Sequence, residues 1–386
     1  MKNLETLIQE LCPDGVEFRT MEEVFEIRNG YTPSKNNPDF WEGGTIPWFR
    51  MEDIRQNGRI LSDAIQHITP AAIKGKGLFP ANSIIIATTA TIGEHALVIA
   101  DSLANQRFTN LAVRKSLSAC LLPKFVFYYM FVIDEWCKKN VNAGNFASVD
   151  MKRFKKLEFP LPPIEVQTEI VRILDKFTSL EAELEAELDC RKRQYEYYRD
   201  KLLSFDNVGG QEVEWKKIGE ICKIMNGRDY KHLSEGDIPV YGSGGIMTYV
   251  NESAYNRPSL LIPRKGSIGN LFYVETPFWT VDTLYWTKID ECLIVPKFFY
   301  YYMTTKDLTK LNMAAGVPSL TQSMLYKIKI PIPSLEEQHR IVSILDRFES
   351  LTTFLQSGLP AEIAARRQQY EHYRDKLLTF KRKGAA

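Results

Sequence analysis

The sequence predicts an α+β protein built from two similar, mixed α/β globular lobes that are joined by two long helices. The helices are expected to pack as an antiparallel intramolecular coiled coil, which would give the molecule pseudo-twofold symmetry. Three observations support this fold class. A segment beginning at Pro160 is nearly repeated from Pro331, apolar residues recur at helical spacing within both copies, and short β-rich runs precede each copy.

The length and composition fit two folded domains. A chain of 386 residues exceeds the size of one typical core. A hydrophobic content of 44% is typical of a folded protein, and no apolar run approaches the roughly 20 residues of a membrane span. The first residues form no secretion signal, so we expect a cytoplasmic protein without a membrane partner. The net charge of +1 neither requires nor excludes a polyanionic partner.

The cysteines and histidines argue against a disulfide framework and a metal site. The six cysteines form no CxxC pair, and the five histidines show no HExxH-type spacing. We therefore expect reduced, mostly buried thiols and no protein-bound metal.

The strongest feature is the repeat itself. PLPPIEVQTEIVRILDKFTSL begins at Pro160, and PIPSLEEQHRIVSILDRFESL begins 171 residues later at Pro331. RKRQYEYYRDKLLSF from Arg191 matches RRQQYEHYRDKLLTF from Arg366, 175 residues later. The second copy is therefore four residues longer, and the extra residues fall near 358–360. Because a proline there removes a helical hydrogen bond, we expect a kink or a restart of the second helix.

Apolar residues alternate at steps of four and three through both copies, which is the pattern of a coiled-coil seam. A helix from Gln167 to Phe205 would be on the order of 58 Å long at about 1.5 Å per residue, so it would extend beyond its lobe. Its seam needs a partner, and the other copy is the nearest candidate. The residues predicted to form this helix-pair seam are Ile170, Leu174, Phe177, Leu184, Leu188, Tyr195, Tyr198, Leu202, Ile341, Leu345, Phe348, Leu355, Tyr370, Tyr373 and Leu377.

The repeat divides the chain into five parts. We predict a first lobe at 1–159, a long helix at 160–206, a second lobe at 207–330, a second long helix at 331–380 and a basic tail at 381–386. Runs such as NSIIIATTATIGEHALVI and PSLLIPRKGSIGNLFYV predict short strands. The stretches KFVFYYMF and KFFYYYM predict a buried helix in each lobe.

This organisation suits a duplex DNA partner. Two similar lobes on a helix pair have an approximate twofold axis, and the DNA backbone has the same symmetry, so one lobe could contact each half-site. Because the lobes differ in their loops, the half-sites should differ as well. We therefore predict a bipartite, asymmetric DNA target whose spacer is fixed by helix length.

The string GYTPSKNNPDFWEGGTIPWFRMEDI, which begins at Gly30, resembles the target recognition domain of type I restriction-modification specificity subunits. The second lobe carries the variants GDIPVYGSGGI and RKGSIGNLFYV. The phrases EIVRILDKF and RKRQYEYYRDKLLSF are similar to shared regions of that family. The resemblance covers nearly the whole chain. The spacing between the helix copies departs from it, so the helix length cannot be transferred from a relative.

The resemblance implies a multisubunit enzyme that recognises double-stranded DNA. It would contain one specificity chain, two methyltransferase (modification) subunits that methylate adenine, and optionally two restriction (endonuclease and translocase) subunits. This chain would be non-catalytic and would bind no cofactor, since S-adenosylmethionine, ATP and Mg would belong to the partner subunits. The helix pair would set the distance between half-sites and would be the main platform for the methylating subunits.

The sequence motifs for methyl transfer, phosphate binding and cation binding are incomplete. An adenine methyltransferase needs an Asn/Asp-Pro-Pro-aromatic loop, and the string NPDF at 37–40 lacks the second proline, so we predict a surface turn. The string YGSGG at 241–245 lacks the GxxxxGK[ST] frame of a phosphate loop. The acidic run at 181–189 would fan around a helix and not converge on a cation.

Base recognition requires Arg or Lys for guanine and Asn or Gln for adenine, with Ser, Thr or backbone amides on phosphates. Polar loop residues of these types are therefore the candidates. The predicted DNA-binding residues are Lys35, Asn36, Asn37, Arg50, Thr89, Thr91, Gln106, Arg107, Asn145 and Ser148 in the first lobe, and Arg228, Lys231, Tyr241, Ser243, Arg264, Lys265, Ser319 and Thr321 in the second.

Two other functions stay open at this point. The chain could be a self-sufficient DNA methyltransferase or nuclease, against which the missing motifs weigh. It could also be a coiled-coil scaffold that binds no nucleic acid.

Overall fold

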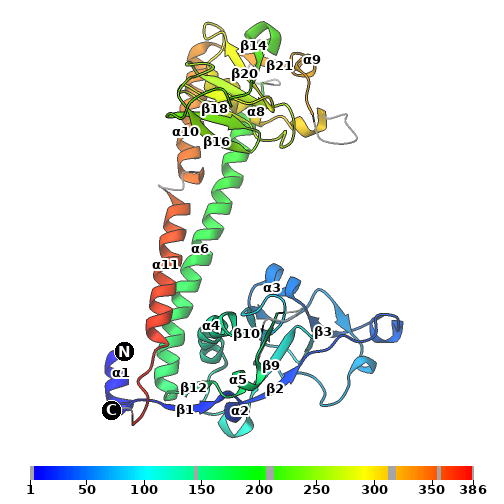
Figure 1. Cartoon of the computed structure of the whole chain (residues 1–386), viewed down its shortest axis with the longest axis vertical. Helices are drawn as coiled ribbons and strands as arrows, with labels where there is room; N and C mark the ends of the chain where they lie inside the picture. Colours follow the sequence, from blue (N-terminus) through cyan, green and yellow to red (C-terminus); the bar gives the residue numbers. More distant parts are fainter. Residues whose placement is uncertain (1–3, 143–146, 206–212, 312–318, 354–357, 385–386) are drawn as a thin grey trace. The chain divides into compact units, whose positions relative to one another are not determined.

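The structure is a computed structural model, and it describes residues 4–142, 147–205, 213–311, 319–353 and 358–384 (Figure 1). The chain forms two compact units. One comprises residues 1–183 and 364–386, and the other comprises residues 184–363. Each unit contains a lobe with β-sheets, called here the first lobe and the second lobe, and a share of the long helices.

The first lobe is built on a five-stranded main sheet with the order β2-β9-β6-β7-β4. Its neighbouring strands are antiparallel except β4, which runs parallel to β7. The side chains of β6 and β7 are all buried because both faces of the sheet are covered. The bounds are β2 Phe25–Asn29, β4 Ile60–Leu61, β6 Ser83–Ala87, β7 His95–Val98 and β9 Phe108–Val113.

Smaller elements complete the first lobe. A three-stranded sheet has the order β5-β3-β8, while β1 pairs with β12 and β10 pairs with β11. The strands are β1 Glu17–Thr20, β3 Ile46–Phe49, β5 His67–Ile68, β8 Leu103–Ala104, β10 Val141–Asn142, β11 Ser148–Val149 and β12 Glu158–Leu161. The short helices are α1 Leu4–Leu11, α2 Met21–Val24, α3 Met51–Asn57, α5 Met151–Lys155, η1 Pro38–Phe40, η2 Pro70–Ala72 and η3 Lys115–Leu117.

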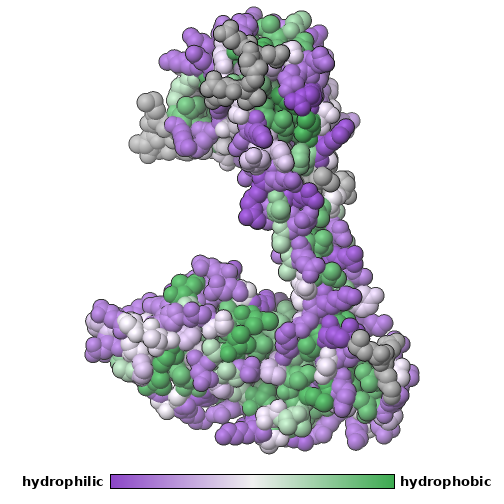
Figure 2. All heavy atoms as spheres, turned by 180° about the vertical axis from the view of Figure 1, so that it is seen from behind, coloured by the Kyte–Doolittle hydropathy of each residue, from purple (hydrophilic) through white to green (hydrophobic). Residues whose placement is uncertain are grey.

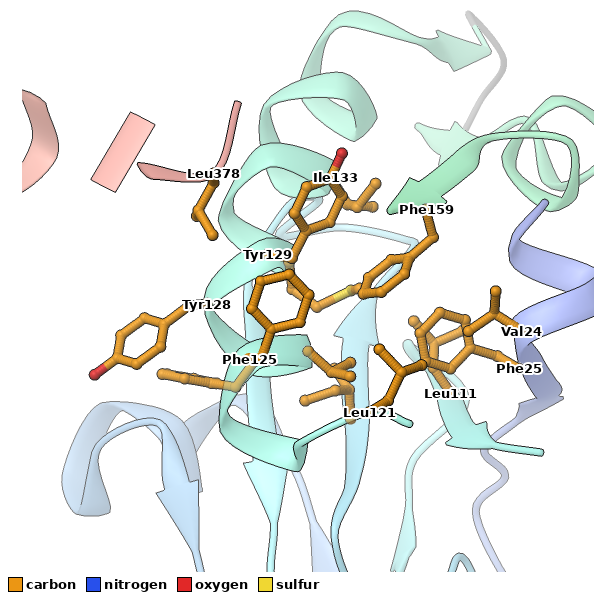
Figure 3. Packing of buried hydrophobic residues seen from close by; sticks show 14 of the residues in the cluster. Val24, Phe25, Leu111, Leu121, Phe125, Tyr128, Tyr129, Ile133, Phe159 and Leu378 are labelled. Carbon is orange, nitrogen blue, oxygen red and sulfur yellow. The ribbon is translucent and has the colours of Figure 1, made fainter. Parts of the chain in front are cut away.

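Helix α4, Pro123–Lys139, is the buried helix predicted from KFVFYYMF. It starts at a proline, whose missing N–H is not needed in the first turn. Phe125 and Tyr129 point from α4 toward Phe159 of β12, with ring centroids 6.3 and 4.8 Å away (Figure 3). Phe159 also contacts Phe25 of β2 at 5.1 Å, so α4, β12 and the main sheet share one core.

The second lobe repeats this topology. Its main sheet has the order β14-β20-β17-β18, which matches β2-β9-β6-β7. Strand β15 pairs parallel with β19 and antiparallel with β16, as β3 does with β8 and β5. The strands are β13 Glu214–Lys217, β14 Cys222–Asn226, β15 Ile238–Gly242, β16 Gly245–Val250, β17 Ser259–Pro263, β18 Phe272–Val274, β19 Trp279–Thr280, β20 Leu284–Ile289 and β21 Lys329–Ile332.

Helix α8, Pro296–Thr304, takes the place of α4 and again begins at a proline. It is the buried helix predicted from KFFYYYM, and Phe298 and Phe299 are fully buried in the second core. The remaining short helices are α7 Ile218–Ile221, α9 Gln322–Leu325 and η4 Leu308–Leu311.

The two repeated segments form the long helices. The first is one continuous helix of 40 residues, α6 Ile164–Leu203. The second forms α10 Leu335–Thr353 and α11 Leu359–Leu377. Gly358, with φ of 96°, directly precedes α11, so the second segment restarts where the sequence predicts a kink or restart. Residues 354–357, which include the predicted seam residue Leu355, lie outside the described residues.

A fully buried glutamine fastens the start of α6 to the first lobe. The side-chain oxygen of Gln167 accepts a hydrogen bond from the backbone N–H of Leu122 at 2.9 Å. Its side-chain nitrogen donates to the backbone carbonyls of Cys120 and Pro162, both at 2.7 Å. One amide therefore satisfies three backbone groups at the start of α4 and α6, which no apolar residue could do.

Gln338 has the same role at the start of α10. Its side-chain oxygen accepts from the backbone N–H of Val295 at 2.7 Å. Its nitrogen donates to the carbonyls of Leu293 at 3.2 Å and Pro333 at 2.9 Å. Gln338 is also fully buried.

The expectation of mostly buried thiols is wrong for half of the cysteines. All six are free, but three are exposed, because Cys120 and Cys292 lie in turns and Cys190 lies on the outer face of α6. Burial raises the pKa of Cys137 and of Cys222 to about 12, so these two thiols stay protonated at neutral pH.

No helix among the described residues is long and apolar enough to cross a membrane. Figure 2 shows hydrophilic side chains over much of the surface, interrupted by smaller apolar patches.

Replacing the buried amide tests its structural role. We expect Gln338→Leu to lower the free energy of unfolding of the second unit by about 2–4 kcal/mol, because each buried backbone group left without a partner costs about 1–3 kcal/mol. Chemical denaturation of the purified chain measures this change. Gln368→Leu, at an exposed position of α11, is the control and should change stability by less than about 0.5 kcal/mol. Equal stability of the two variants would contradict the proposed role of Gln338.

Candidate nucleic-acid interface

Many of the predicted DNA-binding residues gather at one end of each main sheet, which we call the loop end. In the first lobe, β2 and β6 finish at this end and β9 begins there. The backbone N–H of Gly30 donates to the carbonyl of Phe108 at 2.8 Å, and that of Thr88 donates to the carbonyl of Arg107 at 3.0 Å. These bonds hold the loops after β2 and β6 against the turn that precedes β9.

Five predicted residues lie at this first loop end. Thr89 pairs with Ser148 in an antiparallel bridge, and Gln106 and Arg107 are exposed in the turn before β9. The hydroxyl of Thr91 is buried and has no hydrogen-bond partner among the described residues. Polar side chains from three separate loops therefore meet at one place.

Arg50 joins the same surface from β3. The carbonyl of Phe49 accepts from the N–H of Asn105 at 3.0 Å, which places the end of β3 beside the turn before β9. The buried carboxylate of Asp53 accepts from the N–H of Arg50 at 2.6 Å, so the backbone here is fixed. The Arg50 guanidinium lies 3.9 Å from the exposed carboxylate of Glu52, a weak pairing that leaves it able to contact another group.

The second loop end is built by equivalent hydrogen bonds. The N–H of Arg264 donates to the carbonyl of Thr283 at 2.8 Å, and the N–H of Leu320 donates to the carbonyl of Arg264 at 2.9 Å. Lys265 pairs with Ser319 in an antiparallel bridge, as Thr89 pairs with Ser148 in the first lobe. Arg264 and Lys265 thus occupy the places of two threonines.

A glycine lies at the same critical position in both lobes. A Cβ on Gly30 would lie 2.3 Å from the carbonyl oxygen of Asn105, and one on Gly227 would lie 2.0 Å from that of Val281. Only glycine allows the chain after β2 to approach the turn before β9 so closely, and the same holds for β14 and the turn before β20. In the second lobe this path delivers Arg228, whose N–H donates to the carbonyl of Thr280 at 2.8 Å.

Tyr241 and Ser243 lie at the end of β15. The carbonyl of Tyr241 accepts from the N–H of Val281 at 3.0 Å, matching the bond between Phe49 and Asn105 in the first lobe. The N–H of Ser243 donates to the hydroxyl of Thr283 at 3.4 Å. Burial raises the pKa of Tyr241, with a smaller effect of Tyr249, so its hydroxyl remains a donor at neutral pH.

The other predicted residues are less gathered. Lys35 and Asn36 are exposed in the loop after β2, and Lys231 is exposed in the loop after β14. Two more have local structural roles, because Asn37 accepts from the N–H of Asp39 at the start of η1 and Thr321 caps α9. Asn145 lies outside the described residues.

Sequence reasoning missed three polar residues at the loop ends. The hydroxyl of Thr32 donates to the side-chain oxygen of Gln106 at 2.5 Å. The side-chain nitrogen of Gln322 donates to the side-chain oxygen of Asn226 at 3.2 Å. The matching Asn-Gly pairs at Asn29 and Asn226 could have indicated these places in the sequence, since Asn29 ends β2 and Asn226 ends β14.

The long helices pair antiparallel within the first unit. The ring of Phe177 on α6 stacks on Tyr373 of α11 at 5.5 Å and lies 6.4 Å from Tyr370. One turn later on α6, Glu181 forms an ion pair with Arg367, which lies earlier on α11. Rising numbers on one helix thus match falling numbers on the other, as predicted for the coiled coil.

In the second unit, α6 packs on α10. The ring of Tyr198 stacks on Phe348 at 5.6 Å. Tyr195 and Leu202 of α6 pack against the second core, which contains Ile341 and Leu345 of α10.

The predicted seam residues therefore fall into two groups. Ile170 and Leu174 are fully buried in the core of the first lobe, and Ile341 and Leu345 are fully buried in the core of the second. The first turns of α6 and of α10 therefore each pack against a lobe. The remaining seam residues are partly buried or only just exposed, and these are Phe177, Leu184, Leu188, Tyr195, Tyr198, Leu202, Phe348, Tyr370, Tyr373 and Leu377.

One aspartate in each repeat also ties the helix to its lobe. Asp175 of α6 accepts from Lys124 at 2.6 Å and from the Tyr128 hydroxyl at 2.7 Å. Asp346 of α10 makes the corresponding contacts with Lys297 at 2.9 Å and Tyr301 at 2.6 Å. Burial, followed by these hydrogen bonds, raises the pKa of both tyrosines, which keeps them as donors.

The described residues offer little that resembles a reaction centre. Among them, no group of three or more His, Cys, Asp or Glu side chains could hold a metal ion. His95 Nδ1 lies 2.6 Å from the Asp134 carboxylate, but both residues are buried and the imidazole packs between Phe127 and Phe131. This pair is enclosed among aromatic rings in the first lobe.

The chain matches a family model described as the type I restriction modification DNA specificity domain, over residues 13–189 and again over 211–365. It is 43% identical over 365 residues to the EcoprrI specificity subunit of a type I restriction enzyme from Escherichia coli, which covers 88% of this chain and 89% of that protein. It is also 34% identical over 299 residues to the EcoR124I/EcoR124II specificity subunit from the same species, covering 67% and 71%.

Solved structures give the same fold. One, which concerns complex assembly and conformational transition of the type I R-M system, aligns with a TM-score of 0.62 and 17% identity, covering 94% of this chain and 97% of that one. The S subunit of the type I system from M. genitalium aligns with a TM-score of 0.51 and 19% identity, covering 94% and 95%. These findings confirm the predicted fold class. The chain therefore belongs to the family of type I restriction-modification DNA specificity subunits, which recognise DNA and are not themselves catalytic.

Proposed function

We propose that this chain is the DNA-recognition subunit of a type I restriction-modification complex, and that each lobe contacts one half of a bipartite, asymmetric site. The observation that carries the proposal is the construction of the two loop ends. Equivalent backbone hydrogen bonds hold equivalent loops in both lobes, while the side chains that these loops present are different.

The differences at matched positions support an asymmetric target. Thr89 of the first lobe corresponds to Lys265 of the second, because both pair with the serine that follows the buried helix. Lysine contacts guanine or phosphate, whereas threonine offers one hydroxyl to either base edges or phosphate. Two lobes with the same backbone frame but different contacting groups would select different base sequences.

The predicted DNA-binding residues divide by position. Those at the loop ends are the proposed base-reading and phosphate-contacting groups. They include Arg50, Thr89 and Gln106 in the first lobe and Lys265 in the second. Lys35, Asn36 and Lys231 are exposed on neighbouring loops and are proposed to contact the DNA backbone.

The proposed partners follow from the family. Two methyltransferase subunits, and optionally two restriction subunits, would assemble with this chain and would bind S-adenosylmethionine, ATP and Mg. The helix pair offers the platform, since the outward surfaces of α6 and α11 are largely polar and exposed. A cytoplasmic location and the domain limits at 159, 206, 330 and 380 stay predictions.

Methylation assays test the proposal directly. With labelled S-adenosylmethionine, the purified chain alone should transfer no methyl group to DNA, whereas the chain with its methyltransferase subunits should methylate adenines. Mapping these adenines across a genome should give one bipartite sequence. Transfer by the chain alone would support a self-sufficient methyltransferase. Sequence-independent binding by the complex would support a scaffold without recognition.

Single substitutions should change one half-site at a time. We expect Arg50→Ala to relax base preference in one half-site by about 1–3 kcal/mol, the range for loss of a specific base contact, and to leave the other half-site unchanged. The mapped methylation sites of the variant complex measure both effects. Arg19→Ala is the matched control, since Arg19 is an exposed arginine on β1 that pairs with Glu17. A loss of preference in both halves would argue against one lobe per half-site.

The length of α6 should determine the spacer between half-sites. Four residues inserted after Leu184 lengthen the helix by about 6 Å, close to two base-pair rises of roughly 3.4 Å. We expect the mapped site to keep both half-site sequences and to gain about two base pairs of spacer. A four-residue insertion at Gly75, an exposed loop position with φ of 60°, should leave the spacer unchanged. A change in the base sequence of either half-site would contradict the proposal that the helix sets the spacer and the lobes read the half-sites.

A further inference from the structure

Two large apolar side chains stand exposed next to each other at the second loop end. Ile246 is 50% exposed and Met247 is 58% exposed, at the start of β16. The proposed function so far gives these two residues no role. Isolated exposed apolar residues are ordinary, but an adjacent pair at the tip of a hairpin is placed where a ligand can contact both side chains.

The hairpin turn brings backbone and apolar side chains forward together. Gly242 pairs with Gly245, and only Ser243 and Gly244 connect β15 with β16. Gly245 has φ of 119°, which favours glycine, and a Cβ on Gly244 or Gly245 would meet nothing within 4 Å. The tip is therefore narrow and unobstructed, and a large ligand can approach it closely.

Met247 is held in place although it is exposed. The register of β15 and β16 shifts at this point, so Met247 is the extra residue of a β-bulge. Its sulfur would lie only 2.6 Å from a Cβ at Gly242, so the thioether crosses directly over that glycine. The backbone of Gly242 supports the side chain, which stays 58% exposed.

The turn is braced by two segments, and one of them carries positive charge. The side-chain nitrogen of Asn270 donates to the carbonyl of Ser243 at 3.2 Å, and Thr283 accepts from the N–H of the same serine. The loop that ends at Asn270 begins with Arg264 and Lys265. The apolar pair thus stands on a fixed turn beside two cations. Duplex DNA offers both complementary features, phosphates for the cations and base faces or thymine methyls for the apolar groups.

The first lobe is built differently at the matching place. There the chain after Phe49 continues into α3, and the apolar residues Met51 and Ile54 are buried, with 5% and 6% exposure. The Arg50 side chain is 29% exposed beside the more exposed Glu52, and Ile65, which precedes β5, is 48% exposed. The first lobe therefore presents Arg50, Glu52 and the isolated Ile65 here, whereas the second lobe presents a glycine turn and two adjacent apolar side chains.

We propose that Ile246 and Met247 form an apolar wedge that presses against the base pairs of the half-site contacted by the second lobe. Apolar wedges inserted between base steps partly unstack them, and the cost depends on the sequence being deformed. This lobe would then select its half-site partly by DNA deformability, in addition to hydrogen bonds. The inference rests on the proposed function, because it assumes that the second loop end contacts DNA.

The test uses the complex with its methyltransferase subunits and a duplex that carries the mapped site. The double variant Ile246→Ala with Met247→Ala should bind about ten-fold more weakly at every salt concentration, because a lost apolar contact releases no counterion. The slope of log affinity against log salt should equal that of the wild type. Lys265→Gln, in contrast, should reduce that slope by about 0.9, the value for one phosphate contact.

Two controls make the result specific. Ile99→Ala removes an equally exposed isoleucine, 44% exposed, that follows β7 at the opposite end of the first main sheet, and it should leave DNA binding unchanged. The fluorescence of 2-aminopurine placed in the second half-site should rise on binding to the wild-type complex and not on binding to the double variant, because the wedge unstacks bases.

Three outcomes would overturn the wedge. These are unchanged affinity of the double variant, a reduced salt slope, or weaker assembly with the methyltransferase subunits, which would assign the apolar pair to a protein contact. None of them would disprove the proposed function, since the wild-type complex would still bind its site. A wild-type complex that showed no sequence preference would instead remove the proposed function itself.

Discussion

A helix as long as α6 cannot keep its own apolar stripe away from water, and the arrangement of the chain depends on that constraint. At about 1.5 Å per residue its 40 residues extend about 60 Å. The start of the stripe is covered by the first lobe, where Ile170 and Leu174 are fully buried. Farther along, Phe177 stacks on Tyr373 of α11 and Tyr198 on Phe348 of α10. Each stretch of α6 is thus stabilised within its own unit, and the one helix belongs to both.

The attachment of helix to lobe is the same in the two copies. Gln167 and Gln338 each satisfy three buried backbone groups. Asp175 and Asp346 each accept a tyrosine hydroxyl and a lysine. A buried amide with all its hydrogen bonds made allows little rotation, since any tilt would leave backbone groups without partners. The direction in which each helix leaves its lobe is therefore fixed by side chains that are identical in the two repeats.

The sequence allowed much of this to be predicted, and the reasons for its failures are physical. The buried helices at KFVFYYMF and KFFYYYM follow from composition, which is a local property. The pairing of the long helices was predicted from the repeat, because each apolar seam needs a partner and the other copy is the nearest one. The roles of Gln167 and Gln338 could not be predicted in that way, because two of the three partners of each lie 43 to 47 residues away in the sequence. Ile170 and Ile341 show the same limit, since a helical period marks an apolar face but does not tell whether a lobe or a helix covers it. At the loop ends, Arg50 and Lys265 were predicted from residue type, and their role stays a prediction. The exposure of Ile246 and Met247 could not be predicted, because apolar residues in a strand are usually buried.

Comparison of the two lobes separates what the fold requires from what it leaves free. Gly30 and Gly227 permit the same close approach of two chain segments, and any side chain there would collide with backbone. By contrast, the pairs Thr89 and Lys265, or Arg50 and Gly242, hold matched places with unlike chemistry, and their backbone hydrogen bonds do not depend on the side chain. Substitution at an exposed position such as Lys265 alters the side chains presented at the loop end with little cost in stability. The same backbone frame therefore carries different side chains in the two lobes, and the proposed recognition of two different half-sites needs no change of fold.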